Sequence, residues 1–290
     1  MIWVILALLS AIIVSVLIYL SKKEIQRHES IEYATTMRFW MFALSLPLLV
    51  LANTYITTKA LYLLYLASWF NVLGYWFLFK SVKHMDLSVV SPFLNLEVLF
   101  ILLFAWVFYG ESLSFLSLIG LFILLSGLLC LETTRKNIFK GIKKMFKEKY
   151  HWVVVLSSLF YALFKVISRY VLKYENIDLW FYLVITNFFV IINFFIAVYV
   201  IEKLNPFYVL KSKIKSINNL PLLVALNFSQ MVNEYAAYKI APKAVFVSAL
   251  KSTYTFFSEL WDFISRKNKS YKKLIISGIV VMGAIIALLF

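Results

Sequence analysis

Helix-breaking and cross-linking residues are scarce in this sequence. Its 290 residues include 7 glycines, 5 prolines and a single cysteine, Cys130. One cysteine excludes an intramolecular disulfide, and so little glycine and proline excludes a disordered chain or a turn-rich β protein. Charged residues are also few, at 15%, whereas 63% of the residues are hydrophobic. A soluble domain of this length could not build its surface from such a composition, so the sequence predicts an integral membrane protein.

Residues that carry catalysis or bind metals are equally scarce. The sequence has no GxxxxGK[ST] loop, which argues against ATP-driven transport. General acid-base or metal chemistry would need a cluster of histidines or acids. The histidines lie at the edges of apolar segments, at His28, His84 and His151. The aspartates are isolated from one another, at Asp86, Asp178 and Asp262. We therefore expect no enzyme, no cofactor and no metal, and an integral membrane enzyme acting on lipid-linked substrates is the least favoured alternative.

The net charge of +15 is unevenly placed along the chain. Basic residues occur in short runs between apolar segments, as in Lys143-Lys144 and Arg266-Lys267, and aromatic residues interleave with them no more than elsewhere. Lysines at the ends of membrane helices fix orientation and contact anionic headgroups. We therefore expect membrane lipids, and no nucleic acid, as partners of a multi-pass protein of the plasma membrane. The sequence leaves a homodimer open.

Ten apolar stretches predict an all-α membrane protein with ten transmembrane helices. A bilayer core requires about 20 apolar residues per helix, and each span must satisfy its backbone hydrogen bonds internally, which helices do. The stretches are 2–20, 34–52, 60–80, 88–108, 114–131, 152–172, 179–201, 219–238, 243–263 and 272–290.

A long basic break divides the chain into two halves of five spans each. It covers 132–151, and it separates a first repeat at 1–131 from a second repeat at 152–290. Because five is an odd number, the second repeat must enter the membrane inverted relative to the first. Inverted repeats build transporters whose substrate site lies near the midplane, between the halves.

Matches at a constant offset of 156 residues support this duplication: Asn71 with Asn227, Lys83 with Lys239, and Gly127 with Gly283. They predict that the two halves are related by a pseudo-two-fold axis in the membrane plane.

Residues 81–127 resemble the EamA-type repeat of the drug/metabolite transporter superfamily. The resemblance rests on Lys83, Leu96-Glu97, Trp106, Gly110-Glu111 and Gly127, in that order. A second copy of the family's lysine-containing turn is similar to 237–250. The resemblance implies a ten-span transporter.

The chain departs from the family pattern at two positions. Val98 stands where a proline usually follows the glutamate, and Ser265-Arg266-Lys267 replaces the second Gly-Glu.

Polar residues inside the apolar stretches are the main evidence on function. A charge in hydrocarbon costs about 2.5–3.5 kcal/mol on insertion scales, so it usually faces a cavity. In 243–263, Ser248, Ser252, Thr255 and Glu259 recur at helical spacing and form one stripe. Similar stripes on three other segments predict a wet central vestibule. The expected substrate-binding residues are Asn71, Asn95, Glu97, Tyr161, Lys165, Asn227, Glu234, Lys251, Ser252 and Thr255.

These residues favour a secondary transporter, a permease or exporter, of a small polar or charged organic metabolite. Two deep lysines and three acids suit an amino acid or an organic anion, and we expect Lys251 to help bind the anionic part. Proton coupling would need Glu97 or Glu234 to be buried without a partner. A flippase for lipids or lipid-linked sugars on the same scaffold is the alternative.

Several other polar residues have a simpler expected role. Arg38 matches an arginine common in the resembled family and is expected at the membrane interface. Arg169 and Glu259, near segment ends, either reach the interface or face the cavity. On a continuous helix Glu97 lies about 200° from Asn95, which leaves open whether it faces the vestibule or a neighbouring helix. The glycines expected at close helix contacts are Gly120, Gly127, Gly278 and Gly283.

The orientation of the chain is the first testable prediction. We number the loops between the ten predicted spans in chain order. The odd-numbered loops hold 21 lysines and arginines, whereas the termini and even-numbered loops hold 4. The positive-inside rule then places the odd loops in the cytoplasm and both termini outside, although the resembled family usually has cytoplasmic termini. A reporter enzyme that is active only in the cytoplasm should be inactive when it is fused at Phe290. Activity there would show that the family habit outweighs the loop charges.

Overall fold

The computed structural model describes residues 2–28, 30–85, 90, 93–132, 149–213, 216–265 and 271–289. Throughout these residues the only regular secondary structure is helical. Most of the predicted basic loop 132–151 lies outside the described residues.

The first half forms α1 (Ile2–Arg27), α2 (Ser30–Ser45) with a 3-10 turn η1 (Leu46–Val50), α3 (Thr58–His84), α5 (Glu97–Tyr109) and α6 (Phe115–Glu132). The second half forms α8 (Lys149–Lys173), α9 (Leu179–Ile201), α10 (Pro206–Lys213), α11 (Leu220–Ile240), α12 (Ala244–Lys251), α13 (Tyr254–Ser265) and α14 (Tyr271–Leu289). Each predicted apolar stretch therefore overlaps a described helix, whereas the short α10 was not predicted.

Five described segments are long and apolar enough to cross a bilayer: Ile2–Ser21, Ile31–Val50, Thr58–Val82, Tyr150–Lys173 and Leu179–Ile201. Three shorter apolar helices are Glu97–Tyr109, Phe115–Gly127 and Ile275–Ala287. The 21-residue α11 is not among the five, because polar residues including Asn227, Gln230 and Glu234 lower its hydropathy. The chain is a helical membrane protein, and its number of spans stays a prediction.

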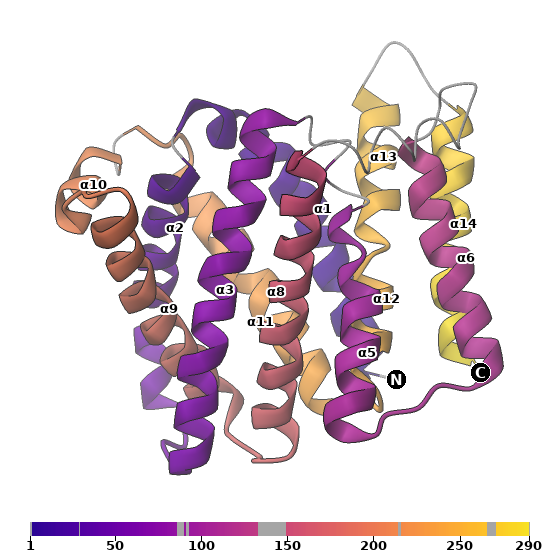
Figure 1. Ribbon diagram of the computed structural model, residues 1–290, viewed down its shortest axis with the longest axis horizontal. Helices are drawn as coiled ribbons and strands as arrows, with labels where there is room; N and C mark the ends of the chain where they lie inside the picture. Colours follow the sequence, from indigo (N-terminus) through magenta and orange to yellow (C-terminus); the bar gives the residue numbers. More distant parts are fainter. Residues whose placement is uncertain are drawn as a thin grey trace.

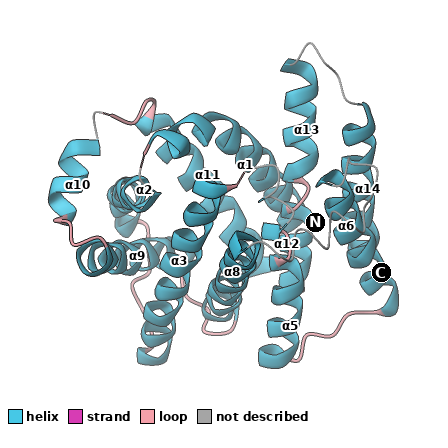
Figure 2. Ribbon diagram, turned by 45° about the horizontal axis from the view of Figure 1, so that its top comes forward, coloured by secondary structure: helices cyan, strands magenta, loops and turns pink. Residues whose placement is uncertain are grey.

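Helices of the two halves pack against each other in a pattern that is unchanged when the halves are exchanged. Exchanging the halves replaces α1, α3 and α5 by α8, α11 and α12–α13, and the reverse. The contact α3–α8 then becomes α11–α1, and the contact α5–α8 becomes the contacts of α12 and α13 with α1. The pairs α2–α9 and α6–α14 exchange with themselves. Figures 1 and 2 place α2, α9 and α10 at one end of the bundle and α6, α13 and α14 at the other. The middle is formed by α1, α3, α8 and α11.

The fourth apolar segment of each half is interrupted near its middle. The expected continuous span 243–263 is instead α12 and α13, separated by a turn at Ser252-Thr253. A matching turn at Asn95-Leu96 precedes α5. At the 156-residue offset Asn95 corresponds to Lys251, so the two interruptions are repeat-related to within one residue.

The interruption of the ninth segment has a local cause. The Ser252 and Thr253 hydroxyls donate to the carbonyls of Ser248 and Leu250, at 3.0 and 2.7 Å. The Thr253 backbone N–H also bonds the Leu250 carbonyl at 3.0 Å, which tightens the helix to an i to i−3 pattern. Side chains that bond nearby carbonyls compete with regular helix in this way. The Val98 N–H makes the same type of bond to the Asn95 carbonyl, at 3.1 Å.

Glycines allow α6 and α14 to approach closely. A Cβ at Gly120 would lie 2.3 Å from the Ala287 nitrogen, and one at Gly283 would lie 2.4 Å from the Leu124 nitrogen. A Cβ at Gly127 would lie 2.9 Å from the Val280 side chain. The expectation of close packing is confirmed at these three glycines.

The expectation of close packing is wrong for Gly278, because a Cβ there would meet nothing within 4 Å.

The contrast between the crowded Gly283 and the open Gly278 gives a matched pair of substitutions. Gly283→Ala should destabilise the protein by about 1–3 kcal/mol, because the obstructing atoms are backbone and cannot move aside. Gly278→Ala, on the same helix, should leave stability unchanged or slightly higher. Thermal unfolding of both variants in detergent measures the difference. Equal unfolding temperatures would contradict the close contact between α6 and α14.

Candidate functional site

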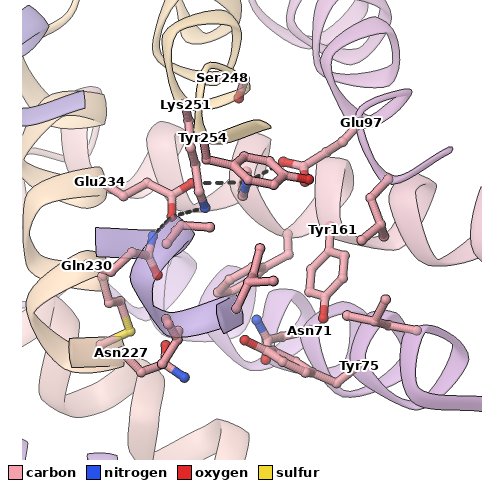
Figure 3. Close-up of a pocket in the computed structure, with 18 of the residues that line it drawn as sticks. Asn71, Tyr75, Glu97, Tyr161, Asn227, Gln230, Glu234, Ser248, Lys251 and Tyr254 are labelled. Carbon is pink, nitrogen blue, oxygen red and sulfur yellow. Dashed lines mark hydrogen bonds and ion pairs between the residues drawn. The ribbon is translucent and has the colours of Figure 1, made fainter. Parts of the chain in front are cut away.

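A cavity of about 270 Å³ lies between helices of both halves, and Figure 3 shows part of its lining. Its walls come from α1, α2, α3, α5, α8, α11 and α12, with Tyr254 at the start of α13. This volume lies just below the range of about 300–1,000 Å³ found for ligand pockets, so it suits a small metabolite.

Four charged side chains in the cavity wall form an alternating chain of ion pairs. Lys165 on α8 pairs with Glu97 on α5 and, at 3.0 Å, with Glu234 on α11. The other Glu234 oxygen lies 2.7 Å from the ammonium of Lys251 on α12. The order Glu97, Lys165, Glu234, Lys251 gives every charge an opposite neighbour. Paired burial of this kind is how charges persist inside a membrane protein.

Glu234 is the centre of this chain. Its Oε2 also accepts a hydrogen bond from the Gln230 amide at 2.5 Å, and Gln230 donates at 3.2 Å to Ser10 on α1. Figure 3 shows Gln230, Glu234 and Lys251 converging. Because both lysines already hold Glu234, and Lys165 also holds Glu97, neither acid is the unpartnered carboxylate that proton coupling would need.

The helix interruptions help to position the two ends of the chain. Glu97 is the first residue of α5 and Lys251 is the last residue of α12. A helix favours negative charge at its N-terminus and positive charge at its C-terminus. Each side chain therefore has the sign that its own helix end stabilises.

The interruption also resolves the orientation of Glu97. Because the chain turns at Asn95-Leu96, the rotation of 200° expected for a continuous helix does not apply, and Asn95 and Glu97 both line the cavity.

The structure brings together nine of the ten expected substrate-binding residues in the cavity lining. They are Asn71, Asn95, Glu97, Tyr161, Lys165, Asn227, Glu234, Lys251 and Ser252. Thr255 is the exception: its hydroxyl donates at 2.9 Å to the Ser252 carbonyl beside the helix interruption. Asn71 and Asn227, which match at the repeat offset, both line the cavity.

The expected interfacial position of Arg38 is wrong. Only 7% of this residue is exposed, and it lines the cavity with its guanidinium carbon 4.2 Å from the centre of the Tyr75 ring. The error came from the segment boundary. The apolar stretch begins at residue 34, whereas α2 already begins at Ser30, so Arg38 lies two turns inside the helix. Ring-bearing residues of the lining, such as Tyr33 and Tyr75, were also missed because nothing distinguishes them from ordinary apolar positions in sequence.

A second buried ion pair lies at the edge of the bundle formed by the even-numbered loops. Arg169 is 0% exposed and donates to Glu111 at 2.7 Å. It also donates to the carbonyls of Tyr238, Ala241 and Pro242, at 3.0, 3.3 and 2.9 Å. Arg169 therefore reaches neither the interface nor the cavity.

Glu111, from the Gly-Glu pair, also fixes the second half through its other oxygen. This oxygen accepts the Ala244 N–H at 2.9 Å, at the start of α12. Glu259, the other residue with an open assignment, does not belong to the lining of the cavity.

The four lysines of this even-loop edge are all bonded to the protein. Lys59 pairs with Glu175 at 2.9 Å and, together with Thr57, keeps the pKa of that carboxyl below its usual value. The others donate to carbonyls: Lys173 to Ala241, Lys239 to Ile177 and Lys243 to Ser112, at 2.9, 2.8 and 2.6 Å. These four lysines hold loops together, which leaves the odd loops as the strongly basic edge.

The part of the chain that the structure describes contains no group of three or more His, Cys, Asp or Glu side chains that could hold a metal ion. The arrangement suits reversible binding of a polar solute, because its charged groups face a cavity between two packed halves.

Comparison with known proteins agrees with this architecture. A solved structure, described only as the crystal structure of a protein, has a TM-score of 0.72 at 12% identity. The alignment covers 99% of this chain and 96% of that one, so the two share a fold. No curated protein matches the chain.

The model of the EamA-like transporter family matches residues 1–133. This match confirms the resemblance that Glu97, Trp106 and Gly110-Glu111 indicated. Over residues 1–133, the chain is therefore similar to the EamA-like transporter family.

Proposed function

We propose that this protein is a secondary transporter of a small polar or charged organic metabolite, which it moves by alternating access around the central cavity. The observation that carries the proposal is the chain of four paired charges in the wall of a metabolite-sized cavity between the halves. Charged groups at such depth in a membrane protein usually belong to a solute pathway. The family match over residues 1–133 supports a transporter over an enzyme.

Ten spans in two inverted five-helix repeats are part of this proposal. The exchange symmetry of the helix contacts supports it, as do the repeat-related interruptions at Asn95-Leu96 and Ser252-Thr253. Interrupted helices that present their ends to a midplane site are a recurring feature of secondary transporters. Irregular backbone at membrane depth is tolerated where it lines a cavity, as it does here.

The two edges of the bundle differ in a way that suits alternating access. On the even-loop edge, the fully buried Arg169 and the partly buried Glu111 join the two halves in one hydrogen-bonded network. The cavity lining extends the opposite way, to Ser21 near the end of α1, Tyr33 near the start of α2 and Phe79 near the end of α3. We infer that this conformation is closed toward the even loops and that its cavity faces the odd-loop edge.

The outer surface suits a lipid environment. Large apolar side chains such as Leu51, Tyr62, Phe122 and Met282 are 61–72% exposed. A bilayer would cover them, and the excess of basic residues in the odd loops would face an anionic cytoplasmic leaflet. We propose the plasma membrane as the location.

The ion-pair chain predicts different outcomes for its two lysines. Lys251→Met should abolish transport and leave the protein folded, because Glu234 keeps Lys165 as a partner. Lys251→Arg should be partly active, since a planar fork does not replace a compact ammonium. Lys165→Met should instead destabilise the protein by about 3–5 kcal/mol, because Glu97 and Glu234 both lose a buried partner.

The measurement has two stages. A metabolite library is screened by thermal shift on the purified full chain, because a ligand that binds only the folded state raises the unfolding temperature. Counterflow of each hit is then measured in proteoliposomes. Lys211→Met, which removes an exposed lysine of α10 outside the cavity, is the control and should transport normally. Normal counterflow by Lys251→Met would remove the chain from the mechanism, and a library without hits would argue against transport itself.

The buried network at the even-loop edge predicts how the cavity becomes accessible from that side. Glu111→Gln should weaken the closure, so that a cysteine at Asn227 in a Cys130→Ser background reacts several-fold faster with a membrane-impermeant maleimide applied from the even-loop side. Glu175→Gln is the matched control, because Glu175 also lies at this edge but pairs with the exposed Lys59. Equal labelling rates in the two variants would show that Glu111 does not hold this edge closed.

A further inference from the structure

Arg38 is a buried cation without a counter-ion in the described part of the chain. Only 7% of the residue is exposed, it lines the cavity, and its guanidinium lies over the face of the Tyr75 ring. Among the residues that the structure describes, no carboxylate oxygen lies within 4.0 Å of its guanidinium, and it donates no hydrogen bond. Arg169, the other buried arginine, pairs with an acid and bonds three carbonyls. Arg38 is thus kept charged without the partners that such burial normally requires.

Among the residues that the structure describes, the charges that line the cavity add up to one positive charge. Glu97 and Glu234 balance Lys165 and Lys251, and Arg38 remains. Arginine does not lose its proton in proteins, so this charge cannot be removed by deprotonation. An isolated charge in a membrane protein is costly and marks a solute pathway more often than a structural contact. A bound molecule with one negative charge would neutralise the site.

The setting of Arg38 suits a carboxylate. The guanidinium presents a planar fork of N–H donors that matches the two oxygens of a carboxylate, and an aromatic face below it fixes the plane. A phosphate monoester carries about −1.5 to −2 charges at neutral pH and would overcompensate a single positive charge. An anion at Lys251 would have to displace the Glu234 carboxylate, whereas one at Arg38 displaces none.

A second unsatisfied group lies near Arg38. Asn71 is 3% exposed, and its buried Oδ1 has no hydrogen-bond donor in the described structure. It lies one helical turn before Tyr75 on α3, so both side chains are on one face of that helix. Figure 3 shows the two side by side in the cavity wall. An acceptor in this position would take a hydrogen bond from a hydroxyl or amide of the bound molecule.

We propose that Arg38 is the anion-binding residue of the cavity and that the solute is an organic monocarboxylate with a hydrogen-bond donor for Asn71. This inference rests on the proposed transport function and names its substrate class. Aromatic residues in the lining, including Tyr33, Tyr75, Phe79 and Tyr161, suit an apolar or aromatic remainder.

The first test needs no ligand. If Arg38 is retained for binding, Arg38→Gln should leave the unfolding temperature of the ligand-free protein unchanged or higher, because it removes an uncompensated charge. Arg169→Gln should lower this temperature clearly, since it removes the donor side of a buried ion pair. A fall with Arg38→Gln as large as that with Arg169→Gln would show that Arg38 is structural and would overturn the proposal.

The second test varies the charge of the ligand at constant shape. The probes 3-phenyllactate, phenylalanine and phenylalaninamide carry about −1, 0 and +1 charges at neutral pH, and 3-phenylpropionate lacks the hydroxyl of the first. They are added to a metabolite library sorted by charge, and thermal shift is measured on the full chain. Monocarboxylates should dominate the hits, and members with a hydroxyl should bind better than their counterparts without one.

Variants then assign these hits to Arg38. Arg38→Gln should weaken the apparent affinity for monocarboxylates about tenfold or more, and Arg38→Lys should restore part of it, as expected for loss of a charge-assisted bidentate contact. Arg27→Gln is the matched control, because Arg27 is 60% exposed and outside the cavity. Its affinities should equal those of the unmodified protein.

The outcomes separate the two proposals. Monocarboxylate binding that survives Arg38→Gln, or hits that are mainly cations, zwitterions or phosphate esters, would overturn the anion site and leave transport standing. A library in which no compound of any charge binds or undergoes counterflow would overturn the transport function, and the anion site with it.

Discussion

The rest of the cavity depends on the ion pairs that the Glu234 carboxylate makes with two lysines. It lies inside an apolar bundle, where an uncompensated charge is costly, and it is tolerated because Lys165 and Lys251 reach it from α8 and α12. Lys165 also reaches Glu97, so three elements of the second half and one of the first meet at this point. Removal of Lys165 or Glu234 leaves a neighbour without any opposite charge, whereas removal of Glu97 or Lys251 leaves its neighbour one remaining partner. The helices around the cavity are therefore coupled by charge as well as by shape.

Two acid-base pairs join α5 and its flanks to α8, at different depths. Lys165 and Arg169 lie one turn apart on α8, and their partners Glu97 and Glu111 lie at the two ends of α5. The Glu97 pair borders the cavity, whereas Arg169 is fully buried behind three carbonyls. A solute can compete only for the first pair. Movement of one half against the other has to rearrange both, so binding at the cavity and closure of the even-loop edge share one helix.

Much of this site follows from the sequence, for one physical reason. A polar side chain on a membrane helix must face another polar group or a cavity, so listing the polar positions found Asn227, Glu234 and Lys251 without any knowledge of packing. The same reasoning failed for Arg38, because apolar stretches mark where hydrophobicity begins and α2 starts four residues earlier. It also could not decide the direction of Glu97 or the environment of Gly278. Those depend on a local turn and on which face of a helix meets its neighbour, and neither is encoded by spacing alone.

The interrupted helices show why continuous helices could not place Glu97 and Lys251 at helix ends inside the membrane. A continuous helix satisfies its own backbone and offers no helix end at membrane depth. Here the hydroxyls of Ser252 and Thr253 add second hydrogen bonds to the Ser248 and Leu250 carbonyls, which also accept backbone N–H groups of the turn. In return, α12 ends at Lys251 and α5 begins at Glu97, each with the charge that its end favours. The end charges then need less compensation from the rest of the cavity, whereas Arg38 lies in the middle of α2 and has no helix end of its own to offset its charge.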